Sequence, residues 1–108
     1  MAIHFGITTR LTNIPSELTQ VFTQDRRGYG IQTSGFGVHK EVNAEGYRDG
    51  NDVVIRTSVP KYDSYTNALL CMGVLLRLAD GAAEKDKNPD LFNVLLKFID
   101  KAFEPPKQ

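Results

Sequence analysis

The sequence predicts an α+β domain: an antiparallel β-sheet, built from an N-terminal strand, a short helix and a three-stranded meander, with two C-terminal α-helices packed on one face. Three observations predict this fold. Apolar and polar residues alternate near the N-terminus and in the middle of the chain, as in strands with one covered face. Glycine-containing turn sequences separate the alternating segments. Two later segments repeat apolar residues at helical spacing.

Composition limits the classes of protein to which the chain can belong. Its 108 residues fit one domain over 1–104, followed by a tail, 105–108, that we expect to fray. Thirteen basic and thirteen acidic residues give zero net charge, so the overall field attracts neither nucleic acid nor an anionic membrane. One cysteine in an apolar segment and the lack of a signal-peptide pattern lead us to expect a cytoplasmic protein.

The first strand is expected where apolar residues fall on alternate positions, at Ile3, Phe5, Ile7 and Leu11. The segment from Asn13 to Glu17 then resembles a helix start, with Pro15 near the first turn. Four apolar residues at helical spacing follow, namely Ile14, Leu18, Val21 and Phe22. They predict a short helix that ends by Gln24.

The three-stranded meander is predicted because the β-favouring residues change from odd-numbered to even-numbered positions. β-Favouring residues lie at odd positions up to Thr33 and at even positions from Phe36 onward, so a turn must separate the two runs. We predict a two-residue turn at Ser34-Gly35, which would pair Thr33 with Phe36 and Ile31 with Val38.

A second turn is predicted at Asp49-Gly50, a strong hairpin signal. It places the β-favouring residues of the last strand, Val53, Ile55, Thr57 and Val59, opposite Ala44 and Val42. In this register Arg56 lies opposite Asn43 and diagonal to Glu41 and Glu45. The polar face of the sheet then carries His39, Glu41, Glu45, Arg56 and Ser58, with His4, Thr8 and Arg10 from the first strand.

Two helices complete the chain. The first, expected over 62–83, is apolar around most of its circumference and leaves a narrow stripe of Thr66, Gly73, Arg77 and Asp80. The second begins at Asn88-Pro89-Asp90, a capping residue followed by proline at the first helical position. Its apolar face comprises Leu91, Phe92, Val94, Leu95, Leu96, Phe98, Ile99, Ala102 and Phe103, and its opposite face comprises Asn93, Lys97, Asp100, Lys101 and Glu104.

A helix that is apolar nearly all round must be covered on more than one side. A second copy of the chain would supply further cover, so we expect a homodimer or a larger symmetric assembly. The alternative is that the sheet and the last helix cover the segment 62–83 without a second copy.

Six residues are candidates for ligand binding because arginine forks suit phosphate or carboxylate and tyrosine offers an aromatic face. They are Arg26, Arg27, Tyr29, Tyr47, Arg48 and Arg56. The arginines at 26 and 27 stand beside the glycines of Gly28-Tyr29-Gly30, which also suit tight turns and strand crossing. The alternative for the sheet face is a solvated surface with weak ion pairs.

Binding of a protein partner is an alternative role for an overlapping set of residues. Tyrosine and arginine anchor many interfaces, and Tyr47 and Arg48 lie near the tip of the second predicted hairpin, with Tyr62 and Tyr65 at the entry to the first long helix. The same entry residues are ordinary for a helix start, where Asp63 or Ser64 would cap the first turn.

Catalytic and metal chemistry is poorly supported. The two histidines, His4 and His39, and the single Cys71 do not make a zinc-ligand pattern, and no serine lies in a nucleophile elbow. We therefore predict no metal and no cofactor. An acid/base pair of His39 and Glu41 is conceivable because alternate residues of a strand share a face.

Two functional hypotheses remain, with a minor third. The first is a non-enzymatic oligomeric binding protein that sequesters a phosphate-bearing small molecule or nucleotide signal, in the manner of viral counter-defence proteins. The second is a protein–protein inhibitor or adaptor acting on a larger partner. The third is a small hydrolase or isomerase that uses His39.

Overall fold

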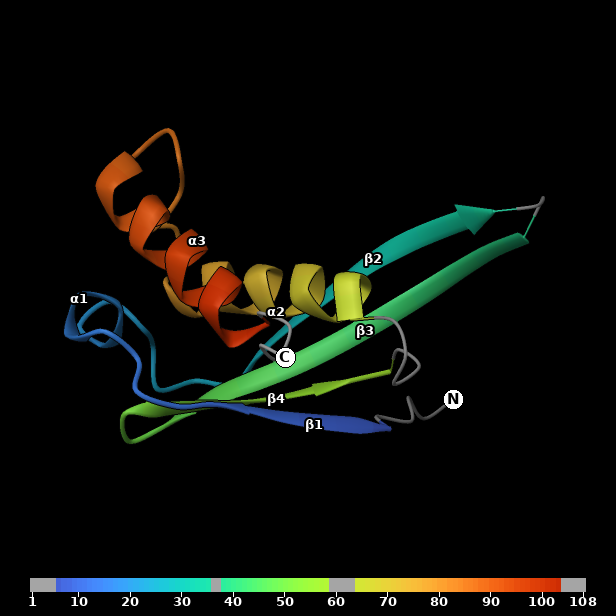
Figure 1. Ribbon diagram of the computed structural model, residues 1–108, viewed down its shortest axis with the longest axis horizontal. Helices are drawn as coiled ribbons and strands as arrows, with labels where there is room; N and C mark the ends of the chain where they lie inside the picture. The colour runs from blue at the N-terminus through green and yellow to red at the C-terminus, as the bar shows by residue number, and fades with distance from the viewer. Residues whose placement is uncertain (1–5, 36–37, 59–63, 104–108) are drawn as a thin grey trace, which may run out of the picture.

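Four antiparallel strands and three helices make up the computed structural model, which describes residues 6–35, 38–58 and 64–103 (Figure 1). In chain order these elements are β1 (Ile7–Leu11), α1 (Ser16–Thr19), β2 (Arg27–Gly35), β3 (Val38–Asp49), β4 (Asp52–Thr57), α2 (Ser64–Leu78) and α3 (Pro89–Ala102). The strand order in the sheet is β1-β4-β3-β2. All three helices lie on one side of the sheet, so the α+β fold is confirmed.

The short helix and the last helix begin as expected. Pro15 precedes α1, and its carbonyl oxygen accepts hydrogen bonds from the N–H groups of Leu18 and Thr19. Asn88 caps α3, because its side-chain oxygen accepts a hydrogen bond from the Leu91 N–H at 3.2 Å, and Pro89 occupies the first turn.

The sheet faces are those that the parity predicts, but both hairpin registers were wrong. In the β2–β3 hairpin Thr33 pairs with Lys40 and Ile31 with Val42, so the strands run on to Gly35 and Val38. The turn therefore falls later than Ser34-Gly35, and Phe36 lies outside the described residues. A shift of two residues on each strand keeps every side chain on its face, so parity alone could not distinguish the two registers.

The β3–β4 hairpin turns at Gly50-Asn51, since Asp49 pairs with Asp52. Gly50 has a φ of 64° and is the first central residue, the position at which a type II′ turn needs glycine. Thr57 accordingly lies opposite Ala44, and Arg56 lies opposite Glu45 instead of Asn43.

The first long helix is shorter than predicted. α2 ends at Leu78, because the chain reverses through two residues with positive φ, Asp80 (55°) and Gly81 (87°). Ala83 is still buried, although it follows the helix. The expected positions Ile3, His4, Phe5, Val59, Lys61, Tyr62, Asp63 and the tail 105–108 lie outside the described residues.

The core lies between the sheet and α2. α2 packs on β2, β3 and β4, and α3 packs on α2 and on α1. The fully covered side chains of α2 are Leu70, Cys71, Val74, Leu75 and Leu78, and they meet Val53 and Ile55 of β4 and Leu95 of α3 in one cluster. Its one buried polar side chain in the described ranges, Thr57, donates a hydrogen bond to Asn67 Oδ1 at 3.0 Å.

Two glycines set how closely α2 approaches the sheet. A Cβ on Gly46 of β3 would lie 2.6 Å from Val74 Cγ1, and a Cβ on Gly73 would overlap the ring of Tyr29 from β2. Gly73 is thus buried, whereas we had placed it on the polar stripe of the helix. Arg77 and Asp80 of the predicted stripe are exposed, and Tyr65 and Leu69 of α2 are exposed as well.

Gly73→Ala is expected to destabilise the protein by about 1–3 kcal/mol, because the added methyl group meets the Tyr29 ring. The sign of the change in the free energy of unfolding tests the close approach, because alanine in an open helical position would stabilise the protein by about 1 kcal/mol. Urea unfolding followed by circular dichroism measures the difference. Gly28→Ala is the control, because its Cβ would make only an ordinary contact with the Ala44 carbonyl at 3.7 Å. Equal or greater stability of Gly73→Ala would contradict the close approach.

The thiol of Cys71 is expected to resist alkylation in the folded protein. It is fully buried in α2, and burial raises the pKa of the thiol to about 12. At pH 8 a thiol with this pKa is ionised to about one part in 10⁴, and the thiolate is the reactive form. Iodoacetamide labelling followed by mass spectrometry should be slow in buffer and fast in urea. Similar rates in both solvents would show that the thiol is accessible.

Candidate functional site

The ligand residues expected from the sequence are divided between the two faces of the sheet. Successive residues of a strand point to opposite faces, so Arg26 and Arg27, which enter β2 together, cannot converge on one ligand. Arg26, Tyr47 and Arg56 belong to the face without helices. Arg27, Tyr29 and Arg48 belong to the face that α2 covers.

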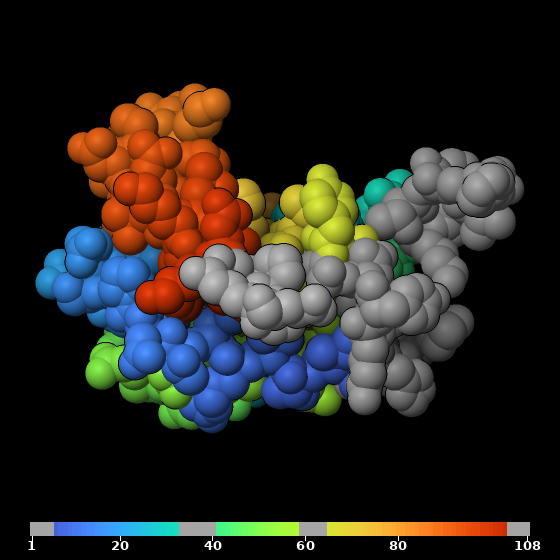
Figure 2. Space-filling view, in the orientation of Figure 1, coloured from blue at the N-terminus to red at the C-terminus, as the bar shows by residue number. Residues whose placement is uncertain are grey.

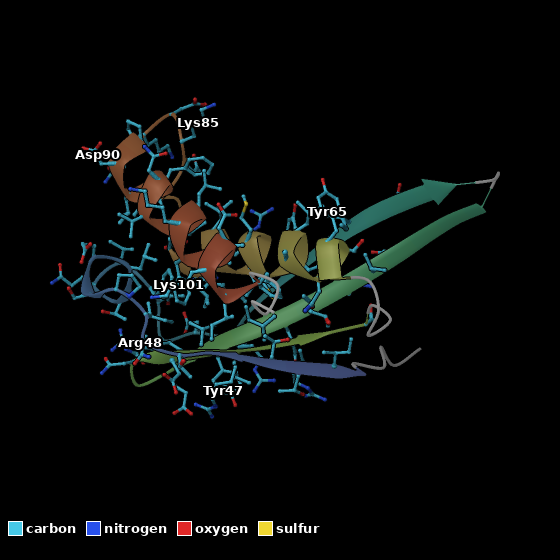
Figure 3. The ribbon with its side chains drawn as sticks, in the orientation of Figure 1. Tyr47, Arg48, Tyr65, Lys85, Asp90 and Lys101 are labelled. Carbon is cyan, nitrogen blue, oxygen red and sulfur yellow. The ribbon has the colours of Figure 1, made fainter. Side chains whose placement is uncertain are left out.

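The first group gathers around Glu45. Arg26 Nη1 lies 2.9 Å from Glu45 Oε1, and Arg56 Nη1 lies 3.3 Å from the same oxygen. The guanidinium of Arg26 also lies over the ring of Tyr47, at 4.9 Å from its centroid. Figure 3 shows Tyr47 on the side of the sheet away from the helices. A single carboxylate thus holds two of the expected ligand arginines.

Another arginine on this face, Arg10, is also paired with carboxylates. Arg10 of β1 contacts both Asp49 and Asp52 at 2.9 Å, and these hydrogen bonds raise the pKa of its guanidinium. Glu41 adds a further exposed carboxylate. Half-exposed pairs of this kind contribute little to stability. They leave no local excess of positive charge that would draw in an anion.

Of the second group, Tyr29 lines a pocket of about 480 Å³ between β2 and the end of α2, and Arg27 and Arg48 do not. Tyr29 covers Gly73, and the Arg77 guanidinium lies 5.9 Å from the centre of the Tyr29 ring. Arg27 Nη2 lies 3.9 Å from both Asp25 and Asp80, and its Nε is buried without a hydrogen-bond partner in the described ranges. The charges that line the pocket cancel, as two cations (Arg77, Lys87) face two carboxylates (Asp80, Glu84).

Arg48 has a structural role. Its Nη1 donates a hydrogen bond to the Thr19 carbonyl at 2.9 Å, and its Nε donates to the Gly50 carbonyl at 3.0 Å. The side chain therefore fastens α1 to the β3–β4 turn.

The tyrosines expected at a partner interface do not share a surface. Tyr65 projects from α2 away from the sheet, whereas Tyr47 lies on the other side of the sheet (Figure 3). Tyr62 lies outside the described residues.

A different pocket, which the sequence did not suggest, lies between α3 and the edge strand β1. It has a volume of about 530 Å³. One wall comes from β1 and the segment that follows it, including Leu11, Thr12, Asn13 and Pro15, and the other wall comes from α3, with Val94, Lys97, Phe98 and Lys101. We call this the β1–α3 pocket.

Local structure explains both walls. Asn13 has a φ of 58°, a conformation that asparagine tolerates better than most residues, and it turns the chain from β1 toward α1. On α3 the core takes Leu91, Leu95 and Ile99. The neighbouring arc, at positions 94, 97, 98 and 101, then faces the pocket because residues three and four apart share one side of a helix.

The charge of the β1–α3 pocket is uncompensated. Its lining contains Arg10, Lys97 and Lys101 and no carboxylate. The Arg10 guanidinium is taken by Asp49 and Asp52, but neither lysine has an ion pair within the described part of the chain. The lysines are one helical turn apart, a spacing at which like charges repel. An anion placed between them would relieve this repulsion.

Sequence reasoning missed this site because it placed Lys97 and Lys101 on the solvated face of the last helix. The two lysines lie at the border of that solvated face, because both are exposed whereas Val94 and Phe98 beside them are half-buried. The available signal was a pair of lysines four residues apart, interleaved with apolar residues. Figure 3 shows Lys101 at the end of α3 that approaches the sheet.

Apart from Arg10, the ionisable groups that line the β1–α3 pocket are Lys97 and Lys101. Its lining residues include no histidine, cysteine, aspartate or glutamate. Cys71 is buried in α2, His4 lies outside the described residues, and the side chain of His39 is not described. Within the described residues no three His, Cys, Asp or Glu side chains are grouped as metal ligands require.

Among the same residues no helix combines the length and apolar character needed to cross a bilayer. Comparison of the chain with protein-family models, with curated proteins and with solved structures gives no significant match.

Proposed function

We propose that the protein is a non-enzymatic binding protein that holds a small phosphate-bearing or other anionic molecule with an apolar body in the β1–α3 pocket. One observation carries the proposal: two lysines that form no ion pair with another described residue border a largely apolar pocket whose lining residues include no carboxylate. A concave, largely apolar site with a few convergent polar groups is the usual form of a small-molecule site.

The two parts of the pocket would take different parts of the ligand. The anionic group would lie between the ammonium groups of Lys97 and Lys101, where each contact with an exposed ammonium group contributes about 0.5–1.5 kcal/mol. The apolar body would cover Val94, Phe98 and Leu11, and each 100 Å² of apolar surface removed from water adds roughly 2.5 kcal/mol. The volume of about 530 Å³ suits a molecule of drug-like size.

Binding is favoured over catalysis by the residue types available. General acid–base chemistry near neutral pH needs a group such as histidine or a tuned carboxylate within reach of the ligand. The pocket offers lysines, threonine hydroxyls, an amide and apolar side chains. These groups hold a ligand but provide no evident route for moving a proton.

A nucleotide signal belongs to the ligand class proposed, because it joins a phosphate to a planar base whose ring faces can pack on apolar side chains. A protein that only holds such a molecule would act by withdrawing it from its receptor, as counter-defence proteins do. This role requires a cytoplasmic location, where such signals are made.

Isothermal titration with octyl phosphate tests the proposal. We expect saturable binding at one site per chain, with weaker binding of inorganic phosphate, which lacks the apolar body, and of octanol, which lacks the charge. Adenosine monophosphate, in a separate titration, tests the nucleotide form of the ligand. Affinity should fall as salt rises, because the lysines are exposed.

The double variant Lys97→Gln/Lys101→Gln should bind octyl phosphate about 10- to 100-fold more weakly, since two charge-assisted hydrogen bonds are lost. The matched control is Lys85→Gln/Lys87→Gln, which removes the same charge from the loop before α3. Figure 3 shows Lys85 at the opposite end of α3 from Lys101. Equal losses in the two double variants, or no binding by the wild type, would reject the pocket.

A further inference from the structure

β1 forms one edge of the sheet (Figure 1) and is paired on one side. Its partner is β4, with Ile7 opposite Thr57 and Leu11 opposite Val53, and no other described strand pairs with it. In an antiparallel pair the backbone groups of alternate residues point away from the partner strand. β1 therefore turns a row of N–H donors and C=O acceptors away from β4, and such a row is a template for the addition of a further strand.

The same edge lines the β1–α3 pocket. Consecutive residues from Thr9 to Asn13 contribute to the lining. Side chains of neighbouring strand residues point to opposite faces, so the unbroken run through Thr9, Arg10 and Leu11 means that the pocket lies along the backbone edge. These three strand residues span roughly 10 Å of edge. In Figure 2 α3 (orange to red) and β1 with the segment after it (blue) lie next to each other. The pocket is thus a groove between a strand edge and a helix.

The helical wall of this groove offers two kinds of contact. Val94 and Phe98 are half-buried and present apolar surface, on which alternate side chains of an added strand would pack. Lys97 and Lys101 present ammonium groups that form no ion pair with a described carboxylate. In a peptide the terminal carboxylate directly follows the last side chain, so an apolar last residue places charge and apolar surface side by side, as the pocket does.

The other edge of the sheet does not offer this combination. Residues 28–30 of the edge strand β2 also line a pocket, with a volume of about 560 Å³. Its lining includes one cation, Arg77, and two carboxylates, Glu41 and Glu45. A terminal carboxylate at that edge would compete with carboxylates already in place. Of the two edges, β1 therefore has the surroundings that complement an anionic strand end.

We propose, on the basis of the anion site proposed above, that its ligand is the C-terminal end of an extended peptide chain, which adds to β1 as a further strand and places its terminal carboxylate between Lys97 and Lys101. The ligand is a peptide because the strand edge repeats donors and acceptors at the spacing of another backbone, which a small anion would leave unused. Main-chain hydrogen bonds supply affinity, and contact with Val94 and Phe98 selects apolar side chains at alternate positions.

The placement of the carboxylate is tested by isothermal titration with the pentapeptide acetyl-Val-Thr-Val-Thr-Val, either as the free acid or as the C-terminal amide. The wild type should bind the acid about tenfold or more tightly than the amide. This preference should disappear in Lys97→Gln/Lys101→Gln and persist in the matched control Lys85→Gln/Lys87→Gln. Circular dichroism checks that each variant is folded. Equal binding of acid and amide by the wild type would overturn the placement.

Strand addition is tested by methylating the peptide backbone. One form of the acid carries N-methyl groups on its second and fourth residues, and the other form carries them on its third and fifth. In an extended strand these two sets of N–H groups point to opposite edges, so the forms have equal composition but block different edges. One form should bind about tenfold or more weakly than the unmethylated peptide, and the other should bind about as well. Equal affinity of the two forms would overturn strand addition.

Amide hydrogen exchange followed by NMR separates failure of this inference from failure of the proposed function. The acid peptide should slow exchange at alternate amides of residues 7–11, because those amides gain hydrogen-bond partners, whereas octyl phosphate should bind without this pattern. Binding of octyl phosphate without binding of the peptide would overturn strand addition and leave the anion site supported. If neither ligand binds, both proposals are wrong.

Discussion

The close seating of α2 on the sheet is the contact on which the rest of the structure depends. It requires glycine at two positions, because a Cβ at Gly46 would meet Val74 and a Cβ at Gly73 would meet the Tyr29 ring. With both glycines in place, α2 buries the arc of Leu70, Val74 and Leu78 and turns the arc of Tyr65 and Leu69 outward. α3 then packs on α2 and α1, and this position determines which of its faces lies across the pocket from β1. The β1–α3 pocket is therefore a consequence of how α2 packs on the sheet.

The α+β class, the order of elements and the two faces of the sheet could be predicted from the sequence because they depend on local periodicity. The capping of α3 by Asn88 and the burial of Leu91, Leu95 and Ile99 follow from spacing and residue type in the same way. Hairpin register could not be predicted, since registers two residues apart on each strand keep Ile31 and Val42 on the same face. The end of α2 was missed because the reversal depends on positive φ angles at Asp80 and Gly81, which an apolar pattern continuing to Ala83 concealed.

The candidate site was harder to predict than the fold because a site depends on which elements meet. The pairs Arg26–Arg27 and Tyr47–Arg48 are adjacent in sequence, but alternation within a strand sends the members of each pair to opposite faces. Lys97 and Lys101, in contrast, acquire significance only because β1 lies across from them and its side of the pocket contains no acid. No feature of the α3 sequence predicts that β1 will lie across the pocket from it. Residue type was thus a weaker guide than the placement of α3 across the pocket from β1.

In a chain of zero net charge, what distinguishes one cluster of cations from another is the presence of carboxylates within reach. Arg26 and Arg56 share Glu45, Arg10 has two aspartates, and Arg27 lies near Asp25 and Asp80, so an incoming anion at any of these positions must compete with a carboxylate already in place. At Lys97 and Lys101 no carboxylate of the described residues forms an ion pair. An anion there gains the attraction of two ammonium groups and relieves their mutual repulsion, while its apolar part gains cover from Val94 and Phe98. For this reason we propose the β1–α3 pocket, rather than the arginine-rich sheet face, as the place for an anionic ligand among the residues that the structure describes.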